Sequence, residues 1–183
     1  MSFAELFIVA VALSMDAFAI AICLGLAMDK AVIQKALIVS MLFGAFQAVM
    51  PLIGYAAATQ FADGIMAYGH WIAFGVLCFL GGKMIVGSLR PKCEKEMGFS
   101  PARLLPLALG TSIDALATGV SFAFLRVSIF QAVLLIGATT FGFSMAGVWI
   151  GRAFGARFRS KAELAGGVVL VLIGIKILIE HLG

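Results

Sequence analysis

Two aspartates stand in matching sequence contexts, each in the middle of a long apolar segment. Asp16 lies in the sequence SMDAFA, and Asp114 lies in the sequence SIDALA. Glu5 and Asp16 are the only charged residues between 3 and 27, and Asp114 is the only one between 104 and 125. Apolar segments longer than about 20 residues are typical of transmembrane helices. A carboxylate near the centre of such a helix costs roughly 2.5–3.5 kcal/mol to insert, so two of them indicate a functional site.

The residues around the aspartates favour a close approach of their two helices. Small residues recur at four-residue spacing in both segments: Ala17, Ala21 and Gly25 in the first, and Ala115, Gly119 and Ala123 in the second. Such spacing lets helix backbones approach closely in lipid, although it is also common in ordinary helix packing. If the helices cross near the aspartates, both carboxylates enter one cavity. Two carboxylates that close cannot both stay ionised cheaply without a cation, so they would share a proton or bind a metal ion.

Further oxygen ligands are predicted in the second and fifth apolar segments. Pro51 has no N–H, so the carbonyl of Gln47 loses its helical partner and becomes a candidate ligand together with the Gln47 side-chain amide. A simple kink is the alternative interpretation. Ser144 follows Gln47 by 97 residues and is its counterpart. Carboxylate, amide and hydroxyl oxygens suit Mn²⁺, Mg²⁺ or Ca²⁺ better than copper or zinc.

Secondary candidates are hydroxyls and amines close to these positions: Ser14, Ser112, Thr140, Lys83 and Lys176. The two lysines lie inside apolar segments, some six residues from the segment ends. We expect such side chains to extend toward the membrane surface. Compensation of the aspartate charges, or a role in proton movement, is the alternative interpretation.

Composition excludes an ordinary water-soluble domain, because 63% of the 183 residues are hydrophobic and 12% are charged. We predict an all-α integral membrane protein with six transmembrane helices at about 3–27, 36–59, 70–89, 101–125, 129–150 and 162–181. The net charge of +4 comes from short loops, so it indicates membrane orientation and not nucleic-acid binding. The three cysteines suggest no disulfide framework.

The distribution of basic residues predicts the orientation. The loops after the first, third and fifth segments carry ten Lys or Arg, and the loops after the second and fourth carry Arg126 alone. Basic loops stay in the cytoplasm, so both termini should lie outside.

The two halves of the chain resemble each other. Ser14, Asp16, Ala17 and Ala19 recur 98 residues later, and Gly81 and Lys83 recur 93 residues later as Gly174 and Lys176. We predict a first three-helix repeat at 1–89, a cytoplasmic linker at 90–103 and a second three-helix repeat at 104–183. Because three is odd, the second repeat would be inverted, an arrangement that many secondary transporters share. Chance similarity among apolar helices is the alternative.

Six sequence runs together resemble one known family: LSMDAFA (13–19), FGAFQ (43–47), PLIG (51–54), HWIAF (70–74), LGGKMI (80–85) and TSIDA (111–115). They are similar to the MntP-type manganese exporters, bacterial inner-membrane proteins in a superfamily of small exporters that includes amino-acid exporters. The resemblance implies six helices in two repeats, Mn²⁺ efflux and a pathway built on the paired aspartates. Gln47 departs from the family, which often carries an acid there.

We therefore expect an inner-membrane exporter of Mn²⁺ that works by alternating access and is coupled to protons. Asp16 and Asp114 would bind the ion, Gln47 and Ser144 would complete its shell, and no cofactor would be needed. Export of another divalent metal such as Cd²⁺, or of an amino acid, is the alternative. An intramembrane aspartyl protease would need Tyr-Asp and Gly-x-Gly-Asp contexts, which are absent, so we expect no enzyme activity. The sequence does not indicate an oligomeric state.

Overall fold

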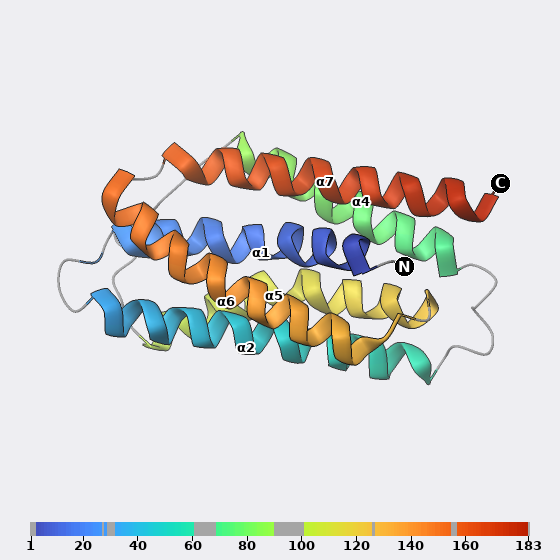
Figure 1. The fold of residues 1–183 in the computed structure, drawn as a ribbon, viewed down its shortest axis with the longest axis horizontal. Helices are drawn as coiled ribbons and strands as arrows, with labels where there is room; N and C mark the ends of the chain where they lie inside the picture. Colours follow the sequence, from blue (N-terminus) through green and yellow to red (C-terminus); the bar gives the residue numbers. More distant parts are fainter. Residues whose placement is uncertain are drawn as a thin grey trace.

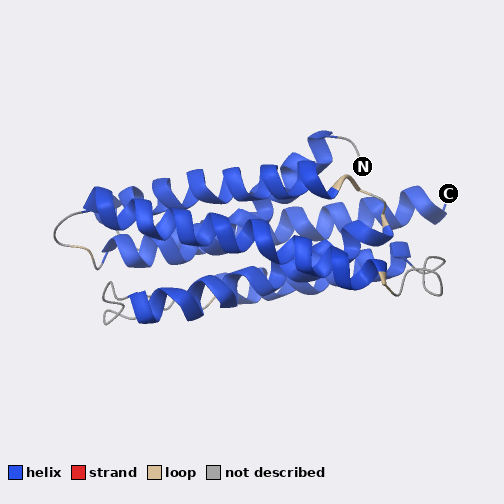
Figure 2. Cartoon of the chain, turned by 90° about the horizontal axis from the view of Figure 1, so that it is seen from below, coloured by secondary structure: helices blue, strands red, loops and turns tan. Residues whose placement is uncertain are grey.

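The protein is a bundle of long helices. The computed structural model describes residues 3–26, 28, 32–60, 69–89, 101–125, 127–154 and 157–182. These residues form α1 (Phe3–Leu26), α2 (Val32–Thr59), α4 (Gly69–Ser88), α5 (Pro101–Phe124), α6 (Ile129–Phe154) and α7 (Arg157–Leu182). No strand occurs in these ranges (Figure 2). All-helical structure suits a membrane, because a helix satisfies its own backbone hydrogen bonds in lipid.

The six predicted segments correspond to the six helices. Two helices begin earlier than expected, α2 at Val32 and α7 at Arg157. Five helices of the described part are long and apolar enough to cross a membrane, and α7 contains a shorter apolar stretch, Leu164–Ile179. Residues 101–103 of the predicted linker form the start of α5, and the other linker residues lie outside the described ranges.

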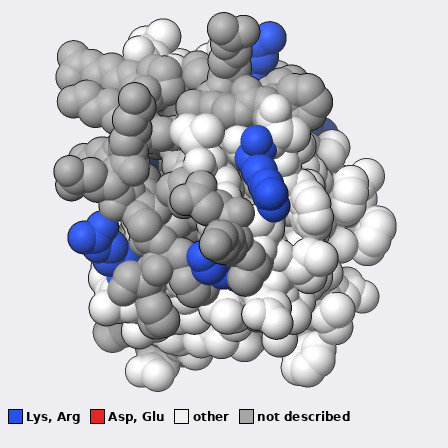
Figure 3. All heavy atoms as spheres, turned by 90° about the vertical axis from the view of Figure 1, so that its left-hand side faces the viewer, with Lys and Arg blue, Asp and Glu red and all other residues white. Residues whose placement is uncertain are grey.

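Consecutive helices run in opposite directions along the long axis of the bundle, which is horizontal in Figure 1. Both chain ends lie on the right of Figure 1, while the C-terminal ends of α1, α4 and α6 lie on the left. Four basic residues, Lys35, Arg103, Arg152 and Lys161, lie within a few residues of helix ends on that left side. We call it the basic end; Lys and Arg are the charged side chains visible there (Figure 3).

Glycines bring three pairs of helices into backbone contact: α1 with α6, α2 with α5, and α4 with α7. α1 packs mainly along α6, α2 packs along α5 and α6, and α4 packs along α7. A side chain at Gly151 would overlap the backbone of Ile22, and one at Gly25 would overlap the backbone of Val148. Lipid tails are as apolar as the side chains, so helix association in membranes depends on this kind of close packing.

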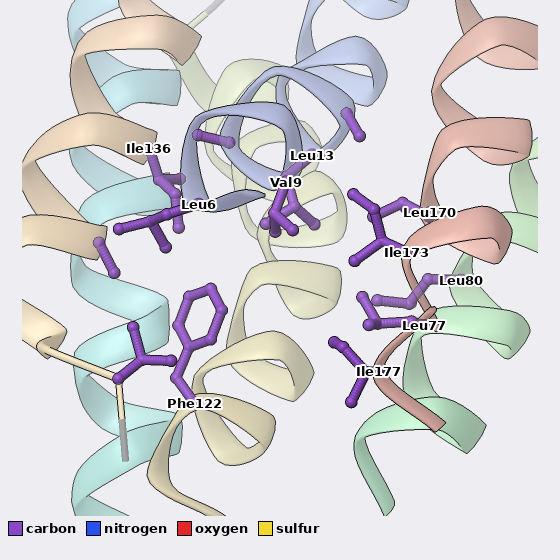
Figure 4. Close-up of a cluster of buried hydrophobic side chains, with 14 of the residues drawn as sticks. Leu6, Val9, Leu13, Leu77, Leu80, Phe122, Ile136, Leu170, Ile173 and Ile177 are labelled. Carbon is purple, nitrogen blue, oxygen red and sulfur yellow. The ribbon is translucent and has the colours of Figure 1, made fainter. Parts of the chain in front are cut away.

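A hydrophobic cluster fills the half of the bundle nearest the chain termini. It joins side chains from five helices, among them Leu6, Val9, Leu13, Leu77, Leu80, Phe122, Ile136, Leu170, Ile173 and Ile177 (Figure 4). We call it the terminus-side cluster. On α1 these residues precede Asp16, and on α5 Phe122 follows Asp114, so the cluster lies on one side of both aspartates.

Cysteine pairing differs from the expectation. Cys23 on α1 is disulfide-bonded, and Cys78 on α4 is free. The bond could not be predicted because the three cysteines are far apart along the chain.

Two alanine substitutions on the same helix test the glycine contacts. Gly151→Ala should lower the thermal unfolding temperature in detergent, because overpacking a tight contact costs about 1–3 kcal/mol. Gly142→Ala is the matched control, since no atom lies within 4 Å of the added methyl group, and it should stabilise α6 by about 0.5–1 kcal/mol. Equal unfolding temperatures for the two variants would contradict the assigned packing of α1 on α6.

Candidate functional site

A cavity of about 320 Å³ lies between α1, α4 and α5. Its lining residues are Asp16, Ile20, Lys83, Met84, Gly87, Pro106, Leu107, Gly110 and Thr111. On α1 the lining runs from Asp16 toward the helix C-terminus, and on α5 it precedes Asp114, so the cavity extends from the aspartates toward the basic end. The terminus-side cluster occupies the opposite side of both aspartates. The cavity therefore lies on the basic-end side of the aspartates.

Asp114 is held by a lysine from a neighbouring helix. The Lys83 ammonium on α4 donates to both carboxylate oxygens of Asp114, each at 3.0 Å. The Asp114 side chain is 7% exposed, while the Lys83 side chain is 51% exposed and lines the cavity. The structure thus supports the alternative interpretation of Lys83, compensation of an aspartate charge. A proton or a metal ion was the neutralising cation expected from the sequence, and here a lysine takes that role.

Asp16 lines the same cavity as Lys83 and is partly buried. Thr111 joins this cavity to α2, because its carbonyl accepts a hydrogen bond of 3.3 Å from the Gln47 side-chain nitrogen. Two of the predicted site residues, Asp16 and Lys83, therefore line one cavity. Asp114 is connected to it through its contact with Lys83, and Gln47 through the backbone of α5.

Two predicted ligands have buried oxygens without partners among the described residues. The Gln47 Oε1 and the Ser144 Oγ are both fully buried and accept or donate no hydrogen bond there. A buried polar atom left unpaired costs about 1–3 kcal/mol. Pro51 lies inside α2 as expected, so the Gln47 carbonyl also lacks its helical partner. Unpaired oxygens of this kind are suited to a hard cation.

The hydroxyl candidates separate into two groups. Ser14 Oγ lies 3.0 Å from Thr140 Oγ1 and 3.2 Å from Thr139 Oγ1, so these residues form a buried hydroxyl cluster between α1 and α6. Ser144 follows Thr140 by one turn on α6. Ser112, in contrast, donates to carbonyls of its own helix, at Ala108 and Leu109. Ser14 makes the equivalent bond within its own helix, to the Ala10 carbonyl, so the two serines differ in the added contacts of Ser14 with α6.

Lys176 is not part of the cavity lining. Its ammonium contacts Glu5 in the first turn of α1. Asp16 lies eleven residues further along α1, which is about 16 Å at the helical rise of 1.5 Å per residue. The two lysines that align in sequence therefore bind acids at different depths of the bundle.

The described residues hold no group of three His, Cys, Asp or Glu side chains that would bind a metal ion by themselves. The candidate ligands for a cation are the two carboxylates and the unpaired oxygens of Gln47 and Ser144. Sequence reasoning missed Pro106, Gly110 and Thr111 as lining residues. Pro106 inside α5 was a usable signal, because a proline within an apolar helix frees a carbonyl, as Pro51 does in α2.

Comparison with known proteins assigns the family. Residues 30–178 match the family model described as "Putative manganese efflux pump". The chain belongs to this family. It is 53% identical over 186 residues to "Putative manganese efflux pump MntP" of Acetivibrio thermocellus, covering 100% of this chain and 93% of the relative. It is 54% identical over 180 residues to the protein of the same name from Desulfitobacterium hafniense, covering 98% and 95% of the two chains. No solved structure matches the chain.

Family membership confirms the resemblance found in the sequence runs. Together with the five long apolar helices of the described part, it identifies a multi-pass membrane protein.

A double-mutant cycle tests the ion pair at the cavity. Lys83→Gln leaves the Asp114 carboxylate without its cation, so this substitution should lower the unfolding temperature in metal-free detergent. The double variant with Asp114→Asn has no unpaired carboxylate there, so its unfolding temperature should return toward that of the wild type. We expect a coupling of about 1–3 kcal/mol, below that of a fully buried pair because Lys83 is half exposed. Additive effects of the two substitutions in thermal unfolding would show that the contact contributes nothing to stability.

Proposed function

We propose that this protein exports Mn²⁺ from the cytoplasm across the bacterial inner membrane. The observation that carries the proposal is a cavity on the basic-end side of two membrane-depth carboxylates, lined by Asp16 and by Lys83, whose ammonium contacts Asp114. The relatives are named as manganese efflux pumps, which makes this chain a transporter and not an enzyme. Mn²⁺ is its substrate, and no resident cofactor is indicated.

The basic end lies in the cytoplasm in this proposal, and both termini lie outside. The support is the concentration of Lys and Arg at one end of the bundle, which follows the positive-inside rule (Figure 3). In this orientation the cavity lies on the cytoplasmic side of the aspartates, the side from which an exporter takes its substrate. The terminus-side cluster then closes the route to the exterior.

Alternating access would come from two inverted repeats that exchange conformations. Supporting contacts occur between α4 and α7. Gly81 packs against Gly167 and Val171, and Gly174 packs against Phe74 and Cys78. Residues 74, 78 and 81 of α4 correspond to residues 167, 171 and 174 of α7 at the offset of 93 residues. The contacts of Gly81 with α7 are therefore repeated by the equivalent contacts of Gly174 with α4. In the same way, α1 corresponds to α5 and α2 to α6, so the packing of α1 on α6 is the counterpart of the packing of α5 on α2.

In the loaded state Asp16 and Asp114 bind the ion directly, and the unpaired oxygens of Gln47 and Ser144 complete its shell. Two carboxylates with neutral oxygens form the hard ligand set that Mn²⁺ prefers. After release of Mn²⁺ to the exterior, a carboxylate takes up a proton, so export is coupled to inward proton movement.

Single asparagine substitutions test the ligands. Asp16→Asn and Asp114→Asn should each abolish Mn²⁺ flux into liposomes that contain a trapped metal-sensitive dye, while both proteins still insert. A lumenal pH probe should report proton movement opposite to Mn²⁺ in the wild type. Flux that survives in both single variants would refute the site, and flux without proton movement would refute the coupling. Flux of Cd²⁺ or an amino acid in place of Mn²⁺ would assign another substrate.

Cysteine accessibility tests the orientation. In a background with the three native cysteines replaced by serine, Gly110→Cys places a thiol in the cavity, where no atom lies within 4 Å of the added carbon. An impermeant thiol reagent should label it in inverted membrane vesicles and not in intact cells. Leu80→Cys, within the terminus-side cluster, is the buried control and should stay unlabelled on both sides. Labelling of Gly110→Cys from outside would reverse the proposed topology.

A further inference from the structure

Both oxygens of the Asp114 carboxylate are occupied before any substrate arrives. The Lys83 ammonium donates to each of them, and the carboxylate has little other exposed surface. Lys83 also lines the cavity through which an ion would approach. An incoming cation therefore meets the lysine first, and it reaches the carboxylate oxygens only by displacing the ammonium.

We propose that Lys83 is a tethered competitor of the transported metal ion and makes the site select divalent over monovalent cations. This inference rests on the proposed function, because it takes Asp114 to be a ligand of the transported ion. It adds a selectivity role for a residue that contributes no ligand atom.

The Lys83 ammonium can be displaced from Asp114. Its side chain is half exposed, and its flexible stem carries a single compact charge. Lys83 lies five residues before the end of α4, which is about 7.5 Å at the helical rise. A displaced ammonium can therefore extend toward the basic end, the membrane-surface position that its sequence context first suggested. The space beside Gly110 in the cavity leaves this route free of a side chain.

Selection by valence follows from the charges. A tethered group competes at an effective concentration in the millimolar range or above. A monovalent ion that replaces the ammonium at Asp114 substitutes one positive charge for another and also loses its hydration, so it gains nothing. A divalent ion brings twice the charge and also attracts Asp16, which lines the same cavity. Only the divalent ion therefore binds Asp114 more strongly than the Lys83 ammonium does.

The other membrane lysine provides a matched control. Lys176 has the same exposed fraction, 51%, and also contacts an acid, but that acid is Glu5 in the first turn of α1. Removing the Lys176 charge changes an ion pair without freeing Asp114.

The test is Mn²⁺ binding to the purified full-length protein in detergent, followed by the electron paramagnetic resonance signal of free Mn²⁺. Ionic strength is held constant with choline chloride or with NaCl. Lys83→Gln should bind Mn²⁺ about tenfold tighter than the wild type in choline, as expected when a tethered competitor is lost. Its affinity should then fall several-fold in NaCl, while the wild type and Lys176→Gln should bind equally in both salts. Unchanged or weaker binding by Lys83→Gln in choline, or binding insensitive to Na⁺, would overturn the proposal.

A second variant tests the opposite change, a weaker Mn²⁺ affinity, and remains informative if Lys83→Gln does not fold. Lys83→Arg keeps the charge and places a planar fork on the carboxylate, which is harder to displace. It should bind Mn²⁺ several-fold more weakly than the wild type and remain insensitive to Na⁺. Wild-type or tighter affinity of Lys83→Arg would contradict competition.

The wild type and Asp114→Asn separate this inference from the proposed function. If the wild type binds no Mn²⁺, or if Asp114→Asn binds it as tightly as the wild type, the proposed function of the site fails. If Asp114→Asn loses binding while Lys83→Gln binds like the wild type, the metal site stands and the competitor role of Lys83 fails.

Discussion

The contact between Lys83 and Asp114 is the interaction on which the site depends. A carboxylate at membrane depth is costly when it is alone, and an ammonium at 3.0 Å from both its oxygens offsets that cost. The same contact fixes α4 against α5 at the level of the cavity. It also explains how a protein can keep two acids at this depth before a metal ion binds, because one of them already has a cation.

The packing on the two sides of this contact is different. Toward the chain termini, large apolar side chains of five helices interlock (Figure 4). Toward the basic end, Gly87, Pro106 and Gly110 leave space between α4 and α5, and this space is the cavity. A second hydrophobic cluster packs α1, α2, α5 and α6 together on this side of the acids, so the space is confined to the contact of α1, α4 and α5. A cavity on that side of the acids suits an exporter in the state that receives its substrate.

Much of this arrangement could be predicted from the sequence, since apolar length and the depth of each acid are local properties. The six helices, the central position of Asp16 and Asp114, and the buried oxygen of Gln47 follow from them. Contacts between helices could not be predicted, because they depend on the register of one helix against another. The alignment of Lys83 with Lys176 suggested equal roles, yet the register of α7 against α1 brings Lys176 to Glu5.

Anomalous diffraction at the manganese absorption edge, from crystals of the protein grown with Mn²⁺, would locate the bound ion. We expect one peak within bonding distance of both the Asp16 and the Asp114 carboxylates, with the Lys83 ammonium moved away from Asp114. A peak elsewhere in the bundle, or a bound ion with the Lys83–Asp114 contact still intact, would contradict it.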